Sequence, residues 1–187
     1  MNPAARLRRG YFDCRYGQLH VHQAIPPGGG FDEAMALLCV PPARGLGSFF
    51  RALLGPLGAD RSIYAPDLPG CGESDAAGAG AGSEQFALAL ADLLDQLHLR
   101  RVDVLAQAEG SATALALAQL RPGAIVRKMV LSAAPAGVLE AAGKQGISCR
   151  EISLAGAAAV ALEAGSVDAQ LDELRGFLAA DPRLLGT

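Results

Sequence analysis

Three side chains with the chemistry for acid–base or nucleophilic catalysis follow short apolar runs: Asp67, Cys71 and Glu109. Cys71 would need a neighbouring base to act as a nucleophile, and the sequence places no histidine beside it. Glu109 precedes a segment with helical spacing, and a carboxylate at a helix N-terminus is stabilised by the helix dipole without any catalytic role. We therefore favour a structural role for Glu109 over that of a general base.

Ser111, His20 and His22 are the remaining candidates for chemistry. Ser111 falls in the first turn of the same expected helix, where its hydroxyl would satisfy free backbone N–H groups, so we predict a capping role. His20 and His22 are two residues apart and therefore share one face of a strand, a spacing that suits a metal. No third ligand is evident, so we predict neither a metal site nor a cofactor.

Alternating strand and helix patterns must position these residues. Tyr16-Gly17 reads as the turn of an antiparallel hairpin, and later apolar runs read as strands covered on both faces. This order predicts an α/β fold, a three-layer sandwich with a mostly parallel twisted sheet. We expect one domain over 1–187, with an arm at 1–10 and a tail at 179–187. Strands are expected at 11–15, 18–25, 34–40, 61–68, 101–107, 126–132 and 147–154, and helices at 48–57, 83–97, 110–120, 138–144 and 166–178.

The loop from Tyr64 to Asp75 reads Tyr-Ala-Pro-Asp-Leu-Pro-Gly-Cys-Gly-Glu-Ser-Asp. It resembles the strand-end loop D-x-P/R-G-x-G-x-S of the α/β-hydrolase superfamily. Its glycines permit a tight backbone path, and its Asp and Ser tie the loop together by hydrogen bonds. None of these residues is catalytic in that family. The resemblance implies a doubly covered sheet with a nucleophile elbow further along the chain.

The elbow of that family, G-x-S-x-G between a strand and a helix, corresponds here to Ala106-Gln107-Ala108-Glu109-Gly110. The small residues at both ends are kept, but the nucleophile position is Ala108, whose methyl group cannot attack a carbonyl. The segment 152–163 resembles the last strand and the loop that carries the catalytic histidine, and the histidine position is Ala159. No histidine occurs after His98, so a shift of register does not supply one.

Two further features depart from the resemblance. Only about a dozen residues separate Ala133 from the last expected strand, so the cap and one strand with the catalytic acid are expected to be missing. The oxyanion loop reads Val40-Pro41-Pro42-Ala43, and proline has no N–H to donate to an oxyanion. Ala43 and Glu109 still offer amides.

The composition argues against several classes of function. A formal net charge of −3 does not indicate a nucleic-acid surface, and Arg6, Arg8 and Arg9 are expected to be a solvated N-terminal tail. No apolar run is long enough to span a bilayer, and we expect neither a signal peptide nor a membrane partner. The four cysteines form no CxxC pair, which fits a reducing cytoplasm.

From these observations we predict a catalytically inactive, hydrolase-like protein that acts through binding. Ligands of open α/β sheets bind at the carboxyl ends of the strands. A homo-oligomer contact or a protein partner is therefore expected there, with a small ligand as the lesser alternative. The second hypothesis is a hydrolase or lyase that uses Glu109, Cys71 or Asp67, and the third is a decayed gene product. The binding edge is expected to comprise Pro41, Pro42, Ala43, Asp67 to Cys71, Gln107, Ala108, Glu109, Gly110 and Ala133 to Ala136.

Overall fold

A seven-stranded sheet forms the centre of the molecule in the order β1-β2-β4-β3-β5-β6-β7. The computed structural model describes residues 4–28, 34–120, 125–154 and 164–179, with backbone alone for 164–168. β1 and β2 form an antiparallel hairpin, β2 pairs antiparallel with β4, and the other neighbours are parallel. The strands are β1 (Arg6–Cys14), β2 (Gly17–Ile25), β3 (Leu37–Val40), β4 (Ile63–Pro66), β5 (Val102–Gln107), β6 (Val126–Ser132) and β7 (Ser148–Glu151).

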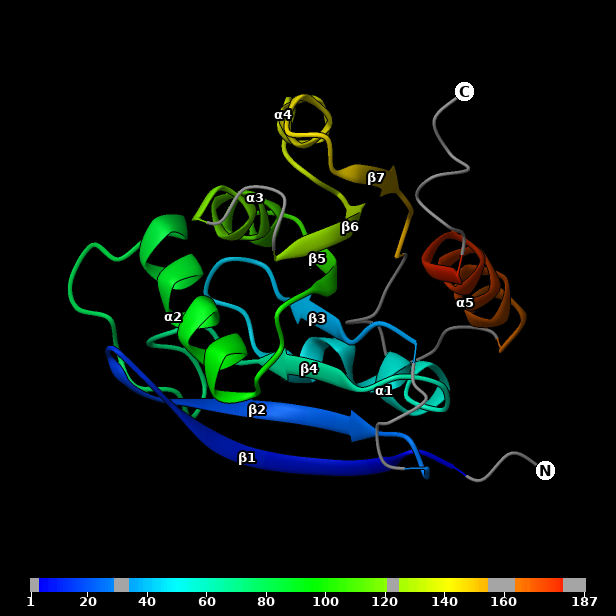
Figure 1. Cartoon of the computed structure of the whole chain (residues 1–187), viewed down its shortest axis with the longest axis horizontal. Coiled ribbons are helices and arrows are strands. Elements are labelled where there is room, and N and C mark those ends of the chain that lie inside the picture. Colours follow the sequence, from blue (N-terminus) through cyan, green and yellow to red (C-terminus); the bar gives the residue numbers. More distant parts are fainter. Residues whose placement is uncertain (1–3, 29–33, 121–124, 155–163, 180–187) are drawn as a thin grey trace.

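Helices cover both faces of this sheet, which confirms the predicted three-layer α/β fold (Figure 1). One apolar core lies beneath α2, α3 and α4, and a second lies beneath α1 and α5. Alanine-rich inner faces let α2 and α3 pack closely together and onto the sheet. The helices are η1 (Gly47–Phe50), α1 (Arg51–Leu57), α2 (Ser83–Gln96), α3 (Gly110–Leu120), α4 (Val138–Lys144) and α5 (Ala164–Ala179).

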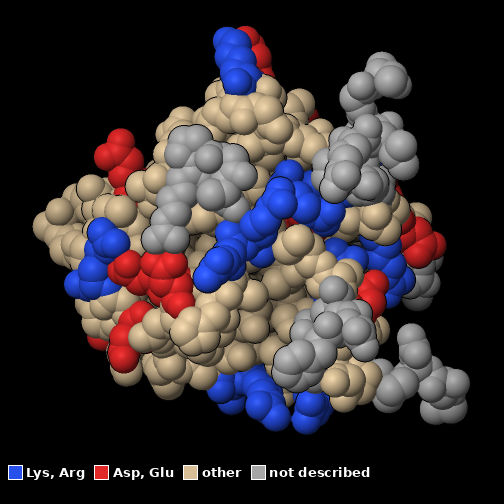
Figure 2. All heavy atoms as spheres, in the orientation of Figure 1, with Lys and Arg blue, Asp and Glu red and all other residues tan. Residues whose placement is uncertain are grey.

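The first strand begins earlier than predicted. β1 starts at Arg6, so residues 6–10 of the expected arm are part of the hairpin. The reason is the position of β1 at the edge of the sheet, where Arg6, Arg8 and Arg9 remain exposed while their backbone pairs with β2. Basic side chains accordingly gather over this edge of the molecule (Figure 2). The expected C-terminal tail lies, except for Ala179, outside the described residues.

The connection between β6 and β7 holds only α4, which agrees with the predicted loss of the cap and one strand. The helix expected at 48–57 begins differently: a 3-10 turn spans Gly47–Phe50, and α1 begins after it at Arg51 with no side-chain cap bond. In the described part of the chain, no helix has both the length and the apolar character that a membrane span requires.

Candidate functional site at the strand–helix elbow

The backbone between β5 and α3 turns sharply at Ala108. This residue adopts a left-handed conformation with φ of 47°, which is uncommon for a residue with a side chain. Its amide donates to the carbonyl of Ser132 at 2.8 Å, so β6 holds the turn in place. Ala133, just after β6, is also left-handed with φ of 50°. Strained backbone thus occurs at the carboxyl ends of two adjacent parallel strands.

The backbone of the loop after β3 lies so close to position 110 that only glycine fits there. A Cβ at this position would lie 2.1 Å from the carbonyl oxygen of Pro41, so no side chain fits without a backbone shift. Ala106, at the other end of the elbow, is fully buried. The prediction that small residues at both ends serve the turn therefore fits the geometry, and the loop after β3 presses against the start of α3.

The side chains at the elbow do not form a nucleophilic centre. Ala108 presents a methyl group, and Glu109 is exposed. Ser111 is fully buried, and its hydroxyl has no hydrogen-bond partner among the described residues, so the predicted capping role is wrong. A buried hydroxyl cannot reach a substrate either. The side-chain oxygen of Gln107 is also buried, and it too has no hydrogen-bond partner among the described residues.

A hollow of about 400 Å³ opens at the carboxyl ends of β5, β6 and β7. Gln107 and Ala133 line it, as predicted for this edge, together with residues 151–154. Ser132 also lines it, and its hydroxyl is held by the amide of Leu154 at 3.0 Å. Glu151 and Ser153 were not predicted to lie here, because the expected strand ran through 147–154, whereas β7 ends at Glu151.

Asp67 has a structural role at the end of β4. Its carboxylate accepts hydrogen bonds from His20 Nδ1 at 2.9 Å, from the amide of Gly47 at 2.7 Å and from the amide of Glu73 at 3.3 Å. The hydroxyl of Ser74 donates to the Asp67 carbonyl at 2.8 Å. The buried carboxylate thus ties the glycine-rich loop to β2 and to the turn before α1. This arrangement leaves no support for Asp67 as a general base.

Asp67 also completes a cluster with His20 and His22, in which one ligand atom of each residue lies within 4.8 Å of the others. The prediction that no third ligand lies near the histidines is therefore wrong. A metal ion would have to compete with the three donors already bound to Asp67. Arg9 and Arg51 also lie near His22, where their positive charges oppose a cation. The cluster is better suited to anchoring the hairpin than to binding a metal.

Cys71 lies in a different part of the surface from Gln107. It lines a separate hollow of about 570 Å³ together with other residues of its loop and residues 76–81. Burial, and then the negative charge of Asp67, raise the pKa of the Cys71 thiol. A thiol with a raised pKa remains protonated near neutral pH and is a poor nucleophile.

The residues of the expected binding edge therefore do not form one continuous site. Gln107 and Ala133 share one hollow, Cys71 lines another, and Asp67 is buried. Pro41 is buried against Gly110, Pro42 is half-buried and Ala43 is exposed. The histidine position Ala159 lies outside the described residues.

Comparisons with known proteins agree with this geometry. A family model described as alpha/beta hydrolase fold matches residues 37–148. None of the curated proteins matches the chain.

Among solved structures, an epoxide hydrolase from Vigna radiata has a TM-score of 0.60 and 20% identity, over 69% of this chain and 39% of its own. An α/β hydrolase from Novosphingobium aromaticivorans has a TM-score of 0.58 and 23% identity, over 68% and 44%. An N-acyl homoserine lactonase complexed with N-hexanoyl homoserine has a TM-score of 0.59 and 22% identity, over 74% and 49%. The chain thus spans less than half of each structure, and these identities support the fold alone.

Proposed function

The chain belongs to the α/β hydrolase fold family, and on that premise we propose that it is a member without serine-hydrolase chemistry that acts by binding at the carboxyl edge of its sheet. The observation that carries the proposal is Ala108. It stands in the strained left-handed turn that this family uses to present a nucleophile, with a methyl group in place of a hydroxyl. The turn is kept, whereas the reacting atom is absent.

The other groups that acyl transfer needs give no compensation. Pro41 and Pro42 have no N–H with which to stabilise an oxyanion, and the amides of Ala43 and Glu109, which could do so, supply neither a nucleophile nor a base. The carboxylate of Asp67 is bound by three donors, and the Cys71 thiol has a raised pKa. Glu109 is exposed, without the burial that would favour a general base. No specific observation therefore favours the alternative of a non-standard enzyme.

Binding at the carboxyl edge is supported by the hollow beside the elbow. Its volume of about 400 Å³ is that of a small-molecule site. Gln107, which lines it, has a side-chain oxygen with no donor among the described residues. Because that oxygen is buried, a bound group with an N–H or O–H would satisfy it once the Gln107 side chain turns into the hollow. This group belongs either to a small ligand or to the surface of a partner, including a second copy of the chain.

Ala108→Arg is expected to weaken this binding. The new side chain would place a long cation at the half-buried tip of the elbow, beside the hollow. Affinity should fall at least about tenfold, which corresponds to about 1.4 kcal/mol of lost interaction. The native mass of the purified protein, and the molecules that co-purify with it, should be compared between the wild type and this variant by native mass spectrometry.

Gln119→Arg is the matched control, because it adds the same cation at an exposed position near the far end of α3. It should keep the wild-type mass and ligands. If Ala108→Arg also keeps the wild-type oligomeric state and every ligand, the binding surface lies elsewhere and the proposal fails.

A further inference from the structure

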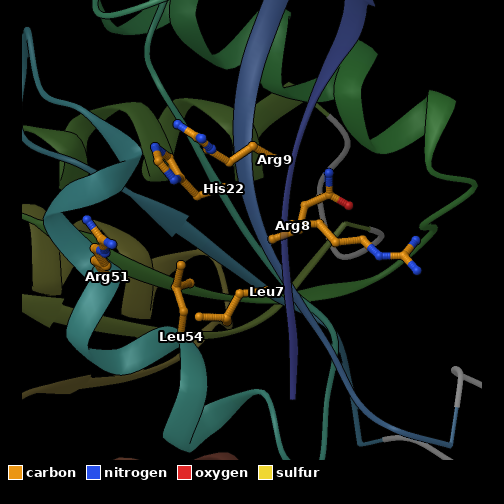
Figure 3. A pocket seen from close by; sticks show the side chains of 7 residues that line it. Leu7, Arg8, Arg9, His22, Arg51 and Leu54 are labelled. Atoms are coloured by element: carbon orange, nitrogen blue, oxygen red, sulfur yellow. The ribbon is translucent and has the colours of Figure 1, made fainter. Parts of the chain in front are cut away.

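A hollow of about 460 Å³ lies between the β1–β2 hairpin and α1. In the sheet, β4 and β3 separate the hairpin from β5, so this hollow is distinct from the elbow. Leu7, Arg9 and His22 line it from the hairpin, and Arg51 and Leu54 line it from α1 (Figure 3).

The strand register brings two of these residues together. Arg9 and His22 are direct partners in the antiparallel ladder, so their side chains project from the same face of the hairpin. Arg51, the first residue of α1, lies on the other side of His22, and Leu7 and Leu54 lie together below these polar groups (Figure 3). Arg8 also borders the hollow, but its side chain extends away from the other two arginines (Figure 3). The hollow thus combines a cationic side with an apolar side.

The positive charge in the hollow lies outside any ion pair within the described part of the chain, and Glu73 attracts Arg9 only at longer range. There, neither Arg9 nor Arg51 forms an ion pair or a side-chain hydrogen bond. The nearby carboxylates are engaged elsewhere: Asp67 binds His20, and Glu73 accepts from the hydroxyl of Tyr11. Burial and then His20 lower the pKa of His22, the negative charge of Asp67 opposes this, and the charges of Arg9 and Arg51 lower the pKa by smaller amounts.

We infer that this hollow binds an oxyanion, a carboxylate or a phosphate, carried on a molecule with a short apolar group. The guanidinium groups of Arg9 and Arg51 present planar sets of N–H donors that match carboxylate and phosphate oxygens. His22 adds a ring N–H. Leu7, 56% exposed, supplies the apolar contact surface above Leu54, which is only 3% exposed, and a ligand there would remove Leu7 from water. The inference is independent of the proposed function at the elbow.

Isothermal titration tests this inference with octyl phosphate and octanoate, each below its critical micelle concentration, and with octanol below its solubility limit. At least one of the two anions should bind with 1:1 stoichiometry, and the stronger of them identifies the oxyanion, while neutral octanol should bind at least about tenfold more weakly. Arg9→Gln and Arg51→Gln should each weaken the anion about tenfold, because each removes charge-assisted hydrogen bonds.

Arg6→Gln is the matched control, since Arg6 lies on the same strand, is exposed and does not line the hollow. It should leave affinity within about twofold, as expected for an exposed charge outside the site. Ala108→Arg should also keep binding, because the elbow is remote. Far-UV circular dichroism checks that every variant is folded. The inference is overturned if neither anion binds at millimolar concentration, if octanol binds as tightly as the anions, or if Arg6→Gln weakens binding as much as Arg51→Gln.

Discussion

Gly110→Ala is expected to destabilise the protein by about 3 kcal/mol, the upper part of the usual range for forcing atoms into a packed site. The added methyl would lie 2.1 Å from the Pro41 carbonyl oxygen and 2.9 Å from the carbonyl oxygen of Val40. Both atoms belong to backbone, which cannot move aside as the end of a flexible side chain can. The loop after β3 would have to separate from the start of α3. Urea denaturation followed by circular dichroism measures the loss.

Gly143→Ala provides the control for the same chemical change. Gly143 lies in α4, and a Cβ there would have no neighbour within 4 Å. Alanine in a helix is favoured over glycine by roughly 0.5–1 kcal/mol, so this variant should be unchanged or slightly more stable. If Gly110→Ala is no less stable than Gly143→Ala, the close contact that defines the elbow is not present in solution.

Asp103→Asn is expected to destabilise the protein by about 3 kcal/mol, the lower end of the loss seen when one partner of a buried ion pair is removed. Asp103 is fully buried on β5 and accepts hydrogen bonds from both Nε and Nη2 of Arg127, the first at 2.8 Å. The neighbouring Lys128 is also fully buried, and its Nζ donates to the carbonyls of Phe177 and Leu178 at the end of α5. Asparagine would leave these cations without the carboxylate.

Burial raises the pKa of the Asp103 carboxyl, and the charge and hydrogen bonds of Arg127 oppose that rise. We expect the carboxylate form to prevail at neutral pH, because its oxygens receive donors that a neutral acid would accept less well. Glu140→Gln is the matched control: it neutralises an exposed i,i+4 partner of Lys144 and should change the free energy of unfolding by less than about 0.5 kcal/mol. A loss below about 1 kcal/mol for Asp103→Asn would show that the cluster does not depend on its negative charge.

The helices and strands in the middle of the chain were predictable because residues that end helices and strands bound their apolar patterns. The predicted boundaries of α3, β6 and α4 match the structure at every end. The start of β1 was missed because residues 6–9 carry three arginines, and an edge strand exposes such side chains without losing its backbone pairing. The charged residues at the start of β1 therefore gave no strand pattern, although their backbone forms hydrogen bonds with β2.

The elbow was likewise predictable, because the resemblance to the family motif G-x-S-x-G places it at Ala106-Gln107-Ala108-Glu109-Gly110, between a strand and a helix. The grouping of side chains around it was not. The separation of Cys71 from Gln107 and the addition of Glu151 depend on how three strands end in space. The partner of His20 and His22 was missed because Asp67 is brought to them only by the pairing of β2 with β4. The buried charge of Lys128 was equally hidden, since its partners are the backbone carbonyls of a helix 49 and 50 residues further along the chain.

Fluorophosphonate labelling tests most directly whether this protein lacks a serine nucleophile. The wild-type chain should be incubated with an excess of the probe and its intact mass measured, beside a known serine hydrolase as a positive control. With Ala108 at the elbow and Ser111 buried, we predict that the mass stays unchanged while the control protein is fully labelled. A stoichiometric adduct on any serine of this chain would contradict the account.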